Sequence, residues 1–296
     1  MKKHAYLVIA HKDDLTFHTL LQMLDDVRND IYIHMDSKNT YYDCSKTEKM
    51  LHHSSVYHVA RTSVTWGGYS LINAELTLLQ EATARGKYTY YHLVSGEDLP
   101  IKSQDQIHRF FEEHEGKEFL RFEKETFSCQ NRVKYYYLFQ EKLGRADRFS
   151  IYKLLNKISL VLQKLVGVDR TKGIQFQKGT QWFSITDDFA RYICDRKEYV
   201  EKTFRNTICG DEVFVQTLLH NSDFRKNLYH PQYDNSLDAI MRLIDWNRGN
   251  PYIFRETDIE EIKASPMLWA RKFDCRIDSN IIMKVAATFS REKVEQ

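Results

Sequence analysis

The sequence predicts an α/β fold built on a mostly parallel, twisted sheet with helices on both faces. Short apolar runs typical of buried strands alternate with segments of helical periodicity along the first 125 residues. The helical segments have the roughly 10–15 residues that connect neighbouring parallel strands. No internal repeat, low-complexity tract or linker interrupts this pattern, and only four prolines occur. The 296 residues therefore favour one large domain over two small ones.

The individual elements follow from local periodicity. Strands are expected where apolar runs or two-residue alternations are short, and helices where apolar residues recur every three to four positions. The most regular helix is expected over 70–84, with Ser70 placed to cap it. The chain beyond the last predicted elements is expected to be irregular to about residue 285. The predicted strands are 5–10, 31–36, 55–60, 88–94, 118–122 and 181–186; the predicted helices are 15–27, 70–84, 104–114, 151–166, 186–193, 212–219 and, more weakly, 258–263.

Polar residues follow two of the predicted strands. Strand 31–36 ends in Asp36, and the strand at 88–94 is followed by Ser95, Gly96, Glu97 and Asp98. Ligands of open parallel sheets bind beyond the carboxyl ends of the strands. We therefore expect a binding site where these two strand ends meet.

Charge and cysteine content exclude several classes of protein. The chain has 43 basic and 41 acidic residues, so no overall field favours nucleic acid. The five cysteines are scattered and form no CxxC pair, which argues against a zinc knuckle or a disulfide framework. The apolar run before His11 has six residues, too short for a signal peptide. No window reaches the roughly 20 apolar residues of a transmembrane helix. A soluble protein, or one bound only at a membrane surface, is expected.

Several common catalytic signatures are missing from the sequence. It contains no GxGxxG, GxxxxGK[ST], HExxH or GxSxG motif. An Asp-x-Asp triplet is also absent, although sugar-nucleotide enzymes with parallel sheets often use one to hold a divalent ion against the diphosphate. If this chain handles a nucleotide sugar, other groups must neutralise the diphosphate.

Two charged pairs suggest such chemistry. Asp211 and Glu212 lie where an amphipathic helix is predicted to begin, and Arg271 and Lys272 follow an apolar run. A carboxylate can remove the proton of an attacking hydroxyl, and fixed cations can hold a departing diphosphate. Simpler interpretations exist for both pairs. Acidic residues favour a helix N-terminus by about 0.3–1 kcal/mol each, and the cations could be solvated or bridged to Asp274.

Six short motifs occur in order between about residue 4 and residue 275, namely YLVIAH (6–11), IYIHMDSK (31–38), VTWGGYS (64–70), HLVSGEDLPIKS (92–103), GDE (210–212) and ARKFD (270–274). Together they resemble the core-2/I-branching glycosyltransferases, a family that includes β-1,6-N-acetylglucosaminyltransferases and peptide O-xylosyltransferases. The resemblance implies a single GT-A-like domain over 1–296. Residues 1–125 would form the nucleotide-sugar-binding half, and residues 126–296 the acceptor and catalytic half. It also implies an inverting transfer from a UDP-sugar with no essential metal or other cofactor.

The resemblance also implies roles for individual residues. Glu212 matches the catalytic base, which alone suffices for a single in-line displacement. Arg271 and Lys272 match the pair that contacts the donor diphosphate. Some members use another arginine about two dozen residues upstream; here the count falls on Gly249, so the adjacent Arg248 is the candidate.

The remaining candidates surround the donor and the acceptor. Asp36 resembles the acid that contacts the nucleotide, although a strand-end Asp also commonly forms an Asx turn. Trp66 lies where the family places an aromatic near the donor, or it is simply core. Asp98 occupies the place of the metal triplet in metal-dependent relatives and is expected to face the donor sugar. His11 completes the donor set, and Glu97, Trp182 and Asp211 are assigned to the acceptor groove.

The segment 145–172 has a different character, because cations flank an apolar stripe of helical spacing. Such a helix can lie on an anionic membrane through residues 148–167, or it can pack on the domain with a solvated basic side. We expect a bacterial-type member located in the cytoplasm, either free or bound peripherally to the inner face of the plasma membrane. Its partners would be a UDP-sugar and a glycan, lipid-linked oligosaccharide or peptide acceptor. N-acetylglucosamine is the first expectation for the donor sugar, xylose is the alternative, and an inactive glycan-binding protein of the same fold is a different class of function.

Overall fold

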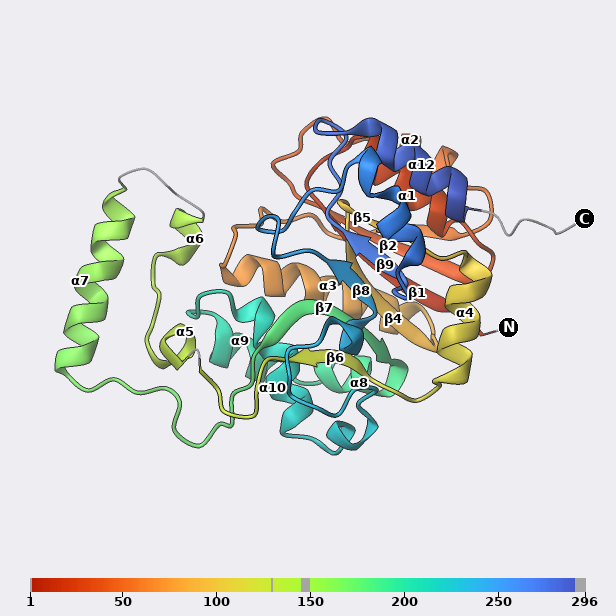
Figure 1. Ribbon diagram of the computed structural model, residues 1–296. Helices are drawn as coiled ribbons and strands as arrows, with labels where there is room; N and C mark the ends of the chain where they lie inside the picture. The colour runs from red at the N-terminus through yellow and green to blue at the C-terminus, as the bar shows by residue number, and fades with distance from the viewer. Residues whose placement is uncertain (1, 129, 145–149, 291–296) are drawn as a thin grey trace, which may run out of the picture.

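A six-stranded sheet forms the centre of the computed structural model, which describes residues 2–128, 130–144 and 150–290 (Figure 1). The strand order is β3-β2-β1-β4-β7-β6. Strands β3, β2, β1 and β4 run parallel to one another, whereas β7 is antiparallel to both β4 and β6. The mostly parallel sheet predicted from the sequence is therefore confirmed. The strands are β1 (His4–Ala10), β2 (Asn29–Met35), β3 (Ser55–His58), β4 (Tyr90–Ser95), β6 (Phe119–Phe122) and β7 (Gly179–Thr186).

Helices cover both faces of this sheet, as predicted. Successive side chains of β1 point to opposite faces. Tyr6 and Val8 join the core under α1, α4 and α12, whereas Ala5 and Leu7 join the core under α3, α8, α9 and α10. The helices on the first face are α1 (Leu15–Leu24), α4 (Gln104–Glu113) and α12 (Ser279–Phe289); those on the second are α3 (Tyr69–Arg85), α8 (Asp187–Cys194), α9 (Lys197–Phe204) and α10 (Phe214–His220).

A second, three-stranded sheet lies at the carboxyl end of β4. It consists of β5 (Asp98–Pro100), β9 (Trp269–Arg271) and β8 (Arg242–Ile244) in the order β5-β9-β8. The prediction of an irregular chain to residue 285 is therefore wrong for β8, for β9 and for the start of α12. The two strands have three residues each, which is too few to show a two-residue alternation in the sequence. The sheet places Asp98 opposite Arg271 and brings β8 alongside β9.

Other predicted boundaries are corrected by local geometry. Helix α3 begins after Gly68, and Ser70 does not cap it; its hydroxyl donates to Glu141 instead. The helix predicted over 212–219 is interrupted at Val213, whose φ of −127° is not helical. A 3-10 turn, η1 (Gly210–Glu212), precedes that break. Thr186 does cap α8, as predicted.

Short helices complete the described chain. Helix α7 stands at one end of the molecule, away from the central sheet (Figure 1). Residues 145–149 of the predicted basic segment lie outside the described residues. The remaining helices are α2 (Cys44–Lys49), α5 (Gln130–Lys134), α6 (Gln140–Leu143), α7 (Ile151–Leu165) and α11 (Ile259–Ala264); the 3-10 turns are η1 (Gly210–Glu212), η2 (Asp223–Asn227), η3 (Leu237–Ile240) and η4 (Glu256–Asp258).

The close pairing of β6 and β7 requires glycine at position 179. A Cβ atom there would lie 1.7 Å from the carbonyl oxygen of Arg121. We expect Gly179→Ala to lower the free energy of unfolding by about 3 kcal/mol or more, because the strand must shift. Gly86→Ala is the control, since its Cβ would meet only ring atoms at 3.6 Å; it should change stability by less than about 0.5 kcal/mol. Equal denaturation curves for both variants would contradict this prediction.

Candidate active site

A cleft of about 950 Å³ opens beyond the carboxyl ends of β1, β2 and β4, where the sequence predicts a binding site. Residues of β7 and β9 form another part of its wall, and α6 borders it as well. Seven of the site residues predicted from the sequence line this cleft: His11, Asp36, Trp66, Glu97, Trp182, Arg271 and Lys272.

Three cations surround the carboxylate of Glu97 in this cleft. Glu97 accepts from Lys12 Nζ at 2.6 Å and from Lys272 Nζ at 2.7 Å, and Arg271 Nη2 lies 3.9 Å away. Burial would raise the pKa of Glu97, but the hydrogen bonds from the two lysines outweigh it and hold the pKa below its ordinary value. Glu97 therefore stays ionised and fixes the cations at the cleft surface. The alternative in which the Arg271-Lys272 pair is bridged to Asp274 is wrong, because both cations face Glu97 and Asp274 binds Lys12 at 3.0 Å.

Asp98 lies beneath the cleft, where it is fully buried. Its carboxylate accepts from Arg271 Nη1 at 2.6 Å and pairs with Arg242 Nη1 at 3.3 Å. Ser95 donates to the same carboxylate through its backbone N–H and hydroxyl. Asp98 therefore orients Arg271 from below and does not face the cleft, which differs from the placement expected from the sequence.

Arg242 is a central residue that the sequence analysis missed. It is 1% exposed, and its guanidinium donates to the carbonyl of Leu93 at 2.6 Å. Burial lowers its pKa to about 10, against the opposing effect of Asp98. The guanidinium carbon also lies 5.3 Å from the ring centre of Trp182 and 5.0 Å from that of Trp269. No motif marks Arg242, because its role depends on β8 pairing with β9.

Two tryptophans of different exposure line the cleft. Trp66 is 46% exposed, so the alternative that it is simple core is wrong. Trp182 is buried apart from 6%, and Arg271 stacks over its ring at 4.6 Å. An aromatic face beside a fixed guanidinium restricts the conformations of that cation. Trp182 thus contacts the predicted diphosphate site directly.

Asp36 and His11 lie at the ends of β2 and β1. Asp36 accepts from the backbone N–H of Lys38 at 2.9 Å, which is the Asx turn given as the alternative, and also lines the cleft. The ammonium of Lys38 lies 3.2 Å from the same carboxylate. His11 Nε2 lies 4.0 Å from Glu97, and burial lowers the pKa of the imidazole despite that neighbour. Both side chains therefore lie where a ligand in the cleft can reach them.

Glu212 is not among the residues that line the cleft with Lys272. Its carboxylate accepts from Arg132 at 2.5 Å and lies 3.6 Å from Lys178 Nζ. The turn that carries it is nevertheless tied to the cleft wall. Cys209, in the left-handed conformation at φ 49°, donates its N–H to the carbonyl of Gly67 at 2.9 Å, directly after Trp66. Strain of this kind clusters at functional sites. The turn that carries Glu212 is therefore bonded to the chain beside Trp66, whereas the Glu212 carboxylate itself does not line the cleft.

Asp211 points into the protein and carries an unusual carboxyl. Burial, together with the neighbouring Glu212, raises its pKa to about 7. Glu75 is also fully buried, and burial followed by the Asp211 charge raises its pKa well above the ordinary value. Glu75 accepts from Gln181 at 2.9 Å, and Gln181 lines the cleft. Asp211 is thus a buried residue of η1 and does not line the cleft that was expected to receive an acceptor.

Arg248 lies outside the cleft. Its guanidinium binds Asp245, Asp258 at 2.9 Å and Glu261 at 2.7 Å, and it stacks on Tyr252 at 4.2 Å. Four partners hold the side chain on the surface around η4 and α11. The structure therefore does not bring Arg248 together with Arg271 and Lys272.

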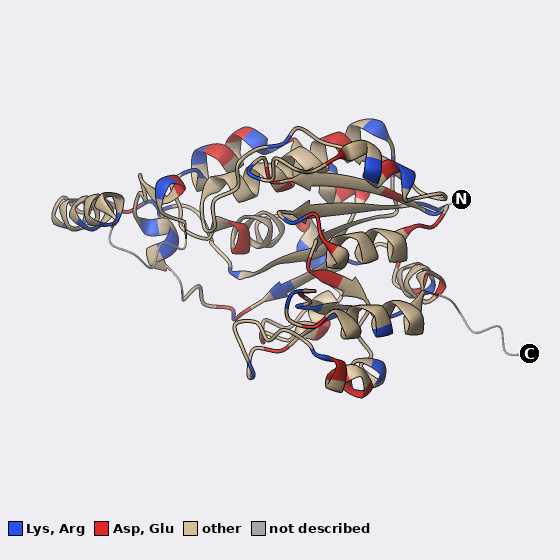
Figure 2. Ribbon diagram, turned by 90° about the horizontal axis from the view of Figure 1, so that it is seen from above, with Lys and Arg blue, Asp and Glu red and all other residues tan. Residues whose placement is uncertain are grey.

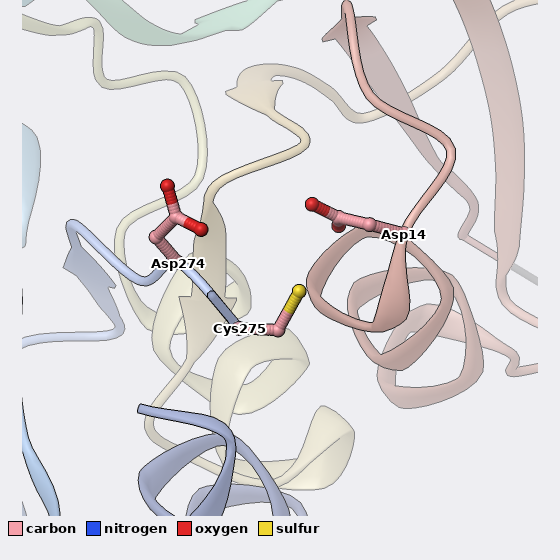
Figure 3. Close-up of side chains that lie close together, drawn as sticks. All are labelled: Asp14, Asp274 and Cys275. Carbon is pink, nitrogen blue, oxygen red and sulfur yellow. The ribbon is translucent and has the colours of Figure 1, made fainter. Parts of the chain in front are cut away.

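Among the described residues, one group has the composition of a metal site. Asp14, Asp274 and Cys275 lie between the start of α1 and the segment after β9, with ligand atoms within 4.8 Å of one another (Figure 3). Asp14 already caps α1. Asp274 binds both Lys12 at 3.0 Å and Arg276 at 2.7 Å, which lower its pKa strongly. Because both carboxylates have these partners, we assign no metal to this group.

Comparison with known proteins identifies the family. The family described as "Branch: Core-2/I-Branching enzyme" matches residues 4–269 of this chain. That match covers most of the sequence and includes five of the six motifs complete. The chain belongs to the core-2/I-branching enzyme family.

Curated relatives of the chain are xylosyltransferases. Xylosyltransferase sqv-6 of Caenorhabditis briggsae is 24% identical over 85% of this chain and 32% of its own length. Xylosyltransferase 2 of Rattus norvegicus is 21% identical over 94% of this chain and 32% of its own length. The chain thus spans about a third of the length of these relatives. Among solved structures, the apo form of mouse xyloside xylosyltransferase 1 is similar with a TM-score of 0.39. The superposition covers 93% of this chain and 99% of that chain, and the two sequences are 8% identical.

The buried ion pair of Asp98 and Arg242 beneath the cleft can be tested by mutation. Asp98→Asn leaves the buried Arg242 without a carboxylate partner and should lower the free energy of unfolding by about 3–5 kcal/mol. Arg242→Met should cost less, because Arg271 still pairs with Asp98. The double variant should lose less than the sum, because both charges disappear together. The exposed pair Asp223–Lys226 is the control and should show no measurable coupling. Strict additivity for Asp98 and Arg242 in urea denaturation would refute the proposed pairing.

Proposed function

We propose that this protein is an inverting glycosyltransferase that transfers a sugar from a UDP-sugar to an acceptor hydroxyl. One observation carries the proposal: Lys12, Arg271 and Lys272 converge on a cleft at the strand ends, held there by Glu97 and Asp98. Family membership supports the same reaction class. In a single displacement, the acceptor oxygen forms a bond to the anomeric carbon as the bond to the diphosphate breaks.

The cations suit a diphosphate because they are oriented before it binds. Lys12, Arg271 and Lys272 keep 17–24% of their side chains exposed while Glu97 and Asp98 hold their charged ends. An entering diphosphate can take over hydrogen bonds now made to Glu97. Preorganised donors of this kind stabilise charge that develops on a leaving oxygen. We therefore expect transfer without an essential metal or other cofactor.

For the donor sugar, we favour xylose over N-acetylglucosamine. The curated relatives are named xylosyltransferases, which supports the alternative from the sequence analysis over its first expectation. Donor choice depends on the room around C2 and C6 of the sugar, since N-acetylglucosamine carries an acetamido group and a hydroxymethyl group that xylose lacks. A peptide, a glycan or a lipid-linked oligosaccharide is the proposed acceptor class.

Glu212 is the proposed general base. Its carboxylate is about a third exposed, so an acceptor hydroxyl can reach it from solvent, and its turn is bonded through Cys209 to Gly67, next to Trp66 of the cleft. Its present partner Arg132 would have to yield to the acceptor. Glu141 is the second candidate, because it lines the cleft, although Ser70 occupies both of its oxygens. Glu97 is a poorer base than either, since its lowered pKa makes it reluctant to accept a proton.

The proposed location is the cytoplasm or the inner surface of the membrane. Among the described helices, none combines the length and apolar character that crossing a bilayer demands. The rival class of function is an inactive glycan-binding protein of the same fold. Turnover of a UDP-sugar separates the two, because a binding protein would retain the sugar without releasing UDP.

Loss of the cation pair should abolish donor recognition. We expect Arg271→Ala combined with Lys272→Ala to weaken UDP binding by on the order of 100-fold, because two charge-assisted contacts to the diphosphate disappear. Calorimetry in the presence of EDTA measures this affinity without a contribution from divalent ions. Arg225→Ala with Lys226→Ala removes an adjacent Arg-Lys pair elsewhere and should bind UDP normally. UDP affinity unchanged in the cleft variant would reject the diphosphate role.

Loss of the base should abolish transfer and leave donor binding intact. Glu212→Gln keeps the size of the side chain but cannot accept the acceptor's proton, so transfer should fall by about 10²–10⁴-fold. Glu141→Gln is the matched comparison and should retain most activity. Sugar transfer to an acceptor is measured alongside UDP affinity for both variants. If Glu141→Gln loses transfer while Glu212→Gln keeps it, the base is Glu141.

A further inference from the structure

Helix α7 presents its apolar side away from the protein. Of its residues, Asn156 is the one that is buried. At about 100° per residue, the exposed apolar side chains fall within one arc of about 100° along the helix. Leu162 and Leu165 are 56% and 77% exposed. The other members of this apolar face are Ile151, Leu154, Ile158 and Val161.

Polar side chains attach the opposite side of α7 to the protein. Asn156 Oδ1 accepts from the backbone N–H of Phe139 at 3.2 Å. Gln163 accepts from the N–H of Tyr136 at 2.7 Å and donates to its carbonyl at 2.9 Å. Because these two amides lie one heptad apart, they fix the rotation of the helix about its axis. The outward direction of the apolar face is therefore built into the structure.

Lysines form a stripe along one border of the apolar face. Lys153, Lys157 and Lys164 fall within an arc of about 40°, next to the apolar arc. The helix contains no acidic residue. In Figures 1 and 2 the helix stands at one end of the molecule, clear of the central sheet. A helix with an outward apolar face and a basic border has the chemistry of a membrane-surface helix.

We infer that α7 docks the protein on an anionic phospholipid surface, with its apolar face among the acyl chains and its lysines at the headgroups. The charge on the helix selects this occupant. In an antiparallel pair of α7 helices from two copies, the stripes of Lys153, Lys157 and Lys164 would lie against each other, which is repulsive. Anionic headgroups complement that stripe, and each lysine near such a surface strengthens binding roughly fivefold. This inference does not rest on the proposed transferase activity.

Vesicle sedimentation of the full chain, without donor, tests the inference. The protein should bind vesicles of phosphatidylcholine mixed with phosphatidylglycerol far better than vesicles of phosphatidylcholine alone. Replacing Lys153, Lys157 and Lys164 by Gln should raise the lipid concentration for half-binding by on the order of 100-fold. Replacing Ile158, Leu162 and Leu165 by Ser should weaken binding similarly. These substitutions lie on exposed positions, and circular dichroism checks that α7 persists.

A matched control removes three other exposed lysines. Lys46→Gln, Lys49→Gln and Lys87→Gln change the net charge equally but lie away from α7, so this variant should bind the anionic vesicles like the parent. Equal loss in this control would reduce the effect to net charge and overturn the inference. Absence of binding by the intact protein, or binding that ignores the apolar substitutions, would overturn it too. Dimers in sedimentation velocity that disappear with the serine variant, without vesicle binding, would assign the face to self-association instead.

Discussion

Two consecutive carboxylates hold the cations of the cleft, and the candidate active site depends on them. Glu97 faces the cleft and binds Lys12 and Lys272, whereas Asp98 lies below and binds Arg271 and Arg242. The backbone enforces this division, because successive residues at the start of a strand point to opposite sides. Asp98 is fully buried, and its carboxylate is bound by two guanidinium groups and by Ser95. Fold and site are therefore coupled through one dipeptide.

This arrangement bears on how a cleft of modest net charge would recognise the proposed diphosphate. The cations Lys12, Arg271 and Lys272 are almost balanced by the buried carboxylates of Glu97 and Asp274, so long-range attraction is weak. Recognition would come from the fixed orientation of the cationic hydrogen-bond donors, since these groups already point at one region of the cleft and need little reorganisation. A divalent ion achieves the same effect by concentrating charge at one point. In the proposed reaction, this cation cluster would take the place of the ion that an Asp-x-Asp triplet holds, a triplet that the sequence lacks.

Much of this was predictable from the sequence, for identifiable reasons. Strong periodicity locates the main strands and helices, and the rule for strand ends locates the cleft. Lys12 was overlooked, although it directly follows His11 at the end of β1 and could have been recognised by that position. Arg242 could not, because three-residue strands leave no pattern and its partner Asp98 lies 144 residues earlier. Arg248 was chosen by counting along the chain, and a cluster of carboxylates holds it elsewhere.

The segment 135–144 connects the two surfaces on which the proposals rest. Its α6 borders the cleft through Glu141 and Leu143, and the preceding backbone at Tyr136 and Phe139 anchors α7. A membrane that holds α7 would therefore also fix one wall of the cleft relative to the lipid surface. An acceptor embedded in that surface would meet the cleft from the side of α6. Such a geometry favours lipid-linked acceptors by raising their local concentration, even if the cleft itself contacts only the sugar.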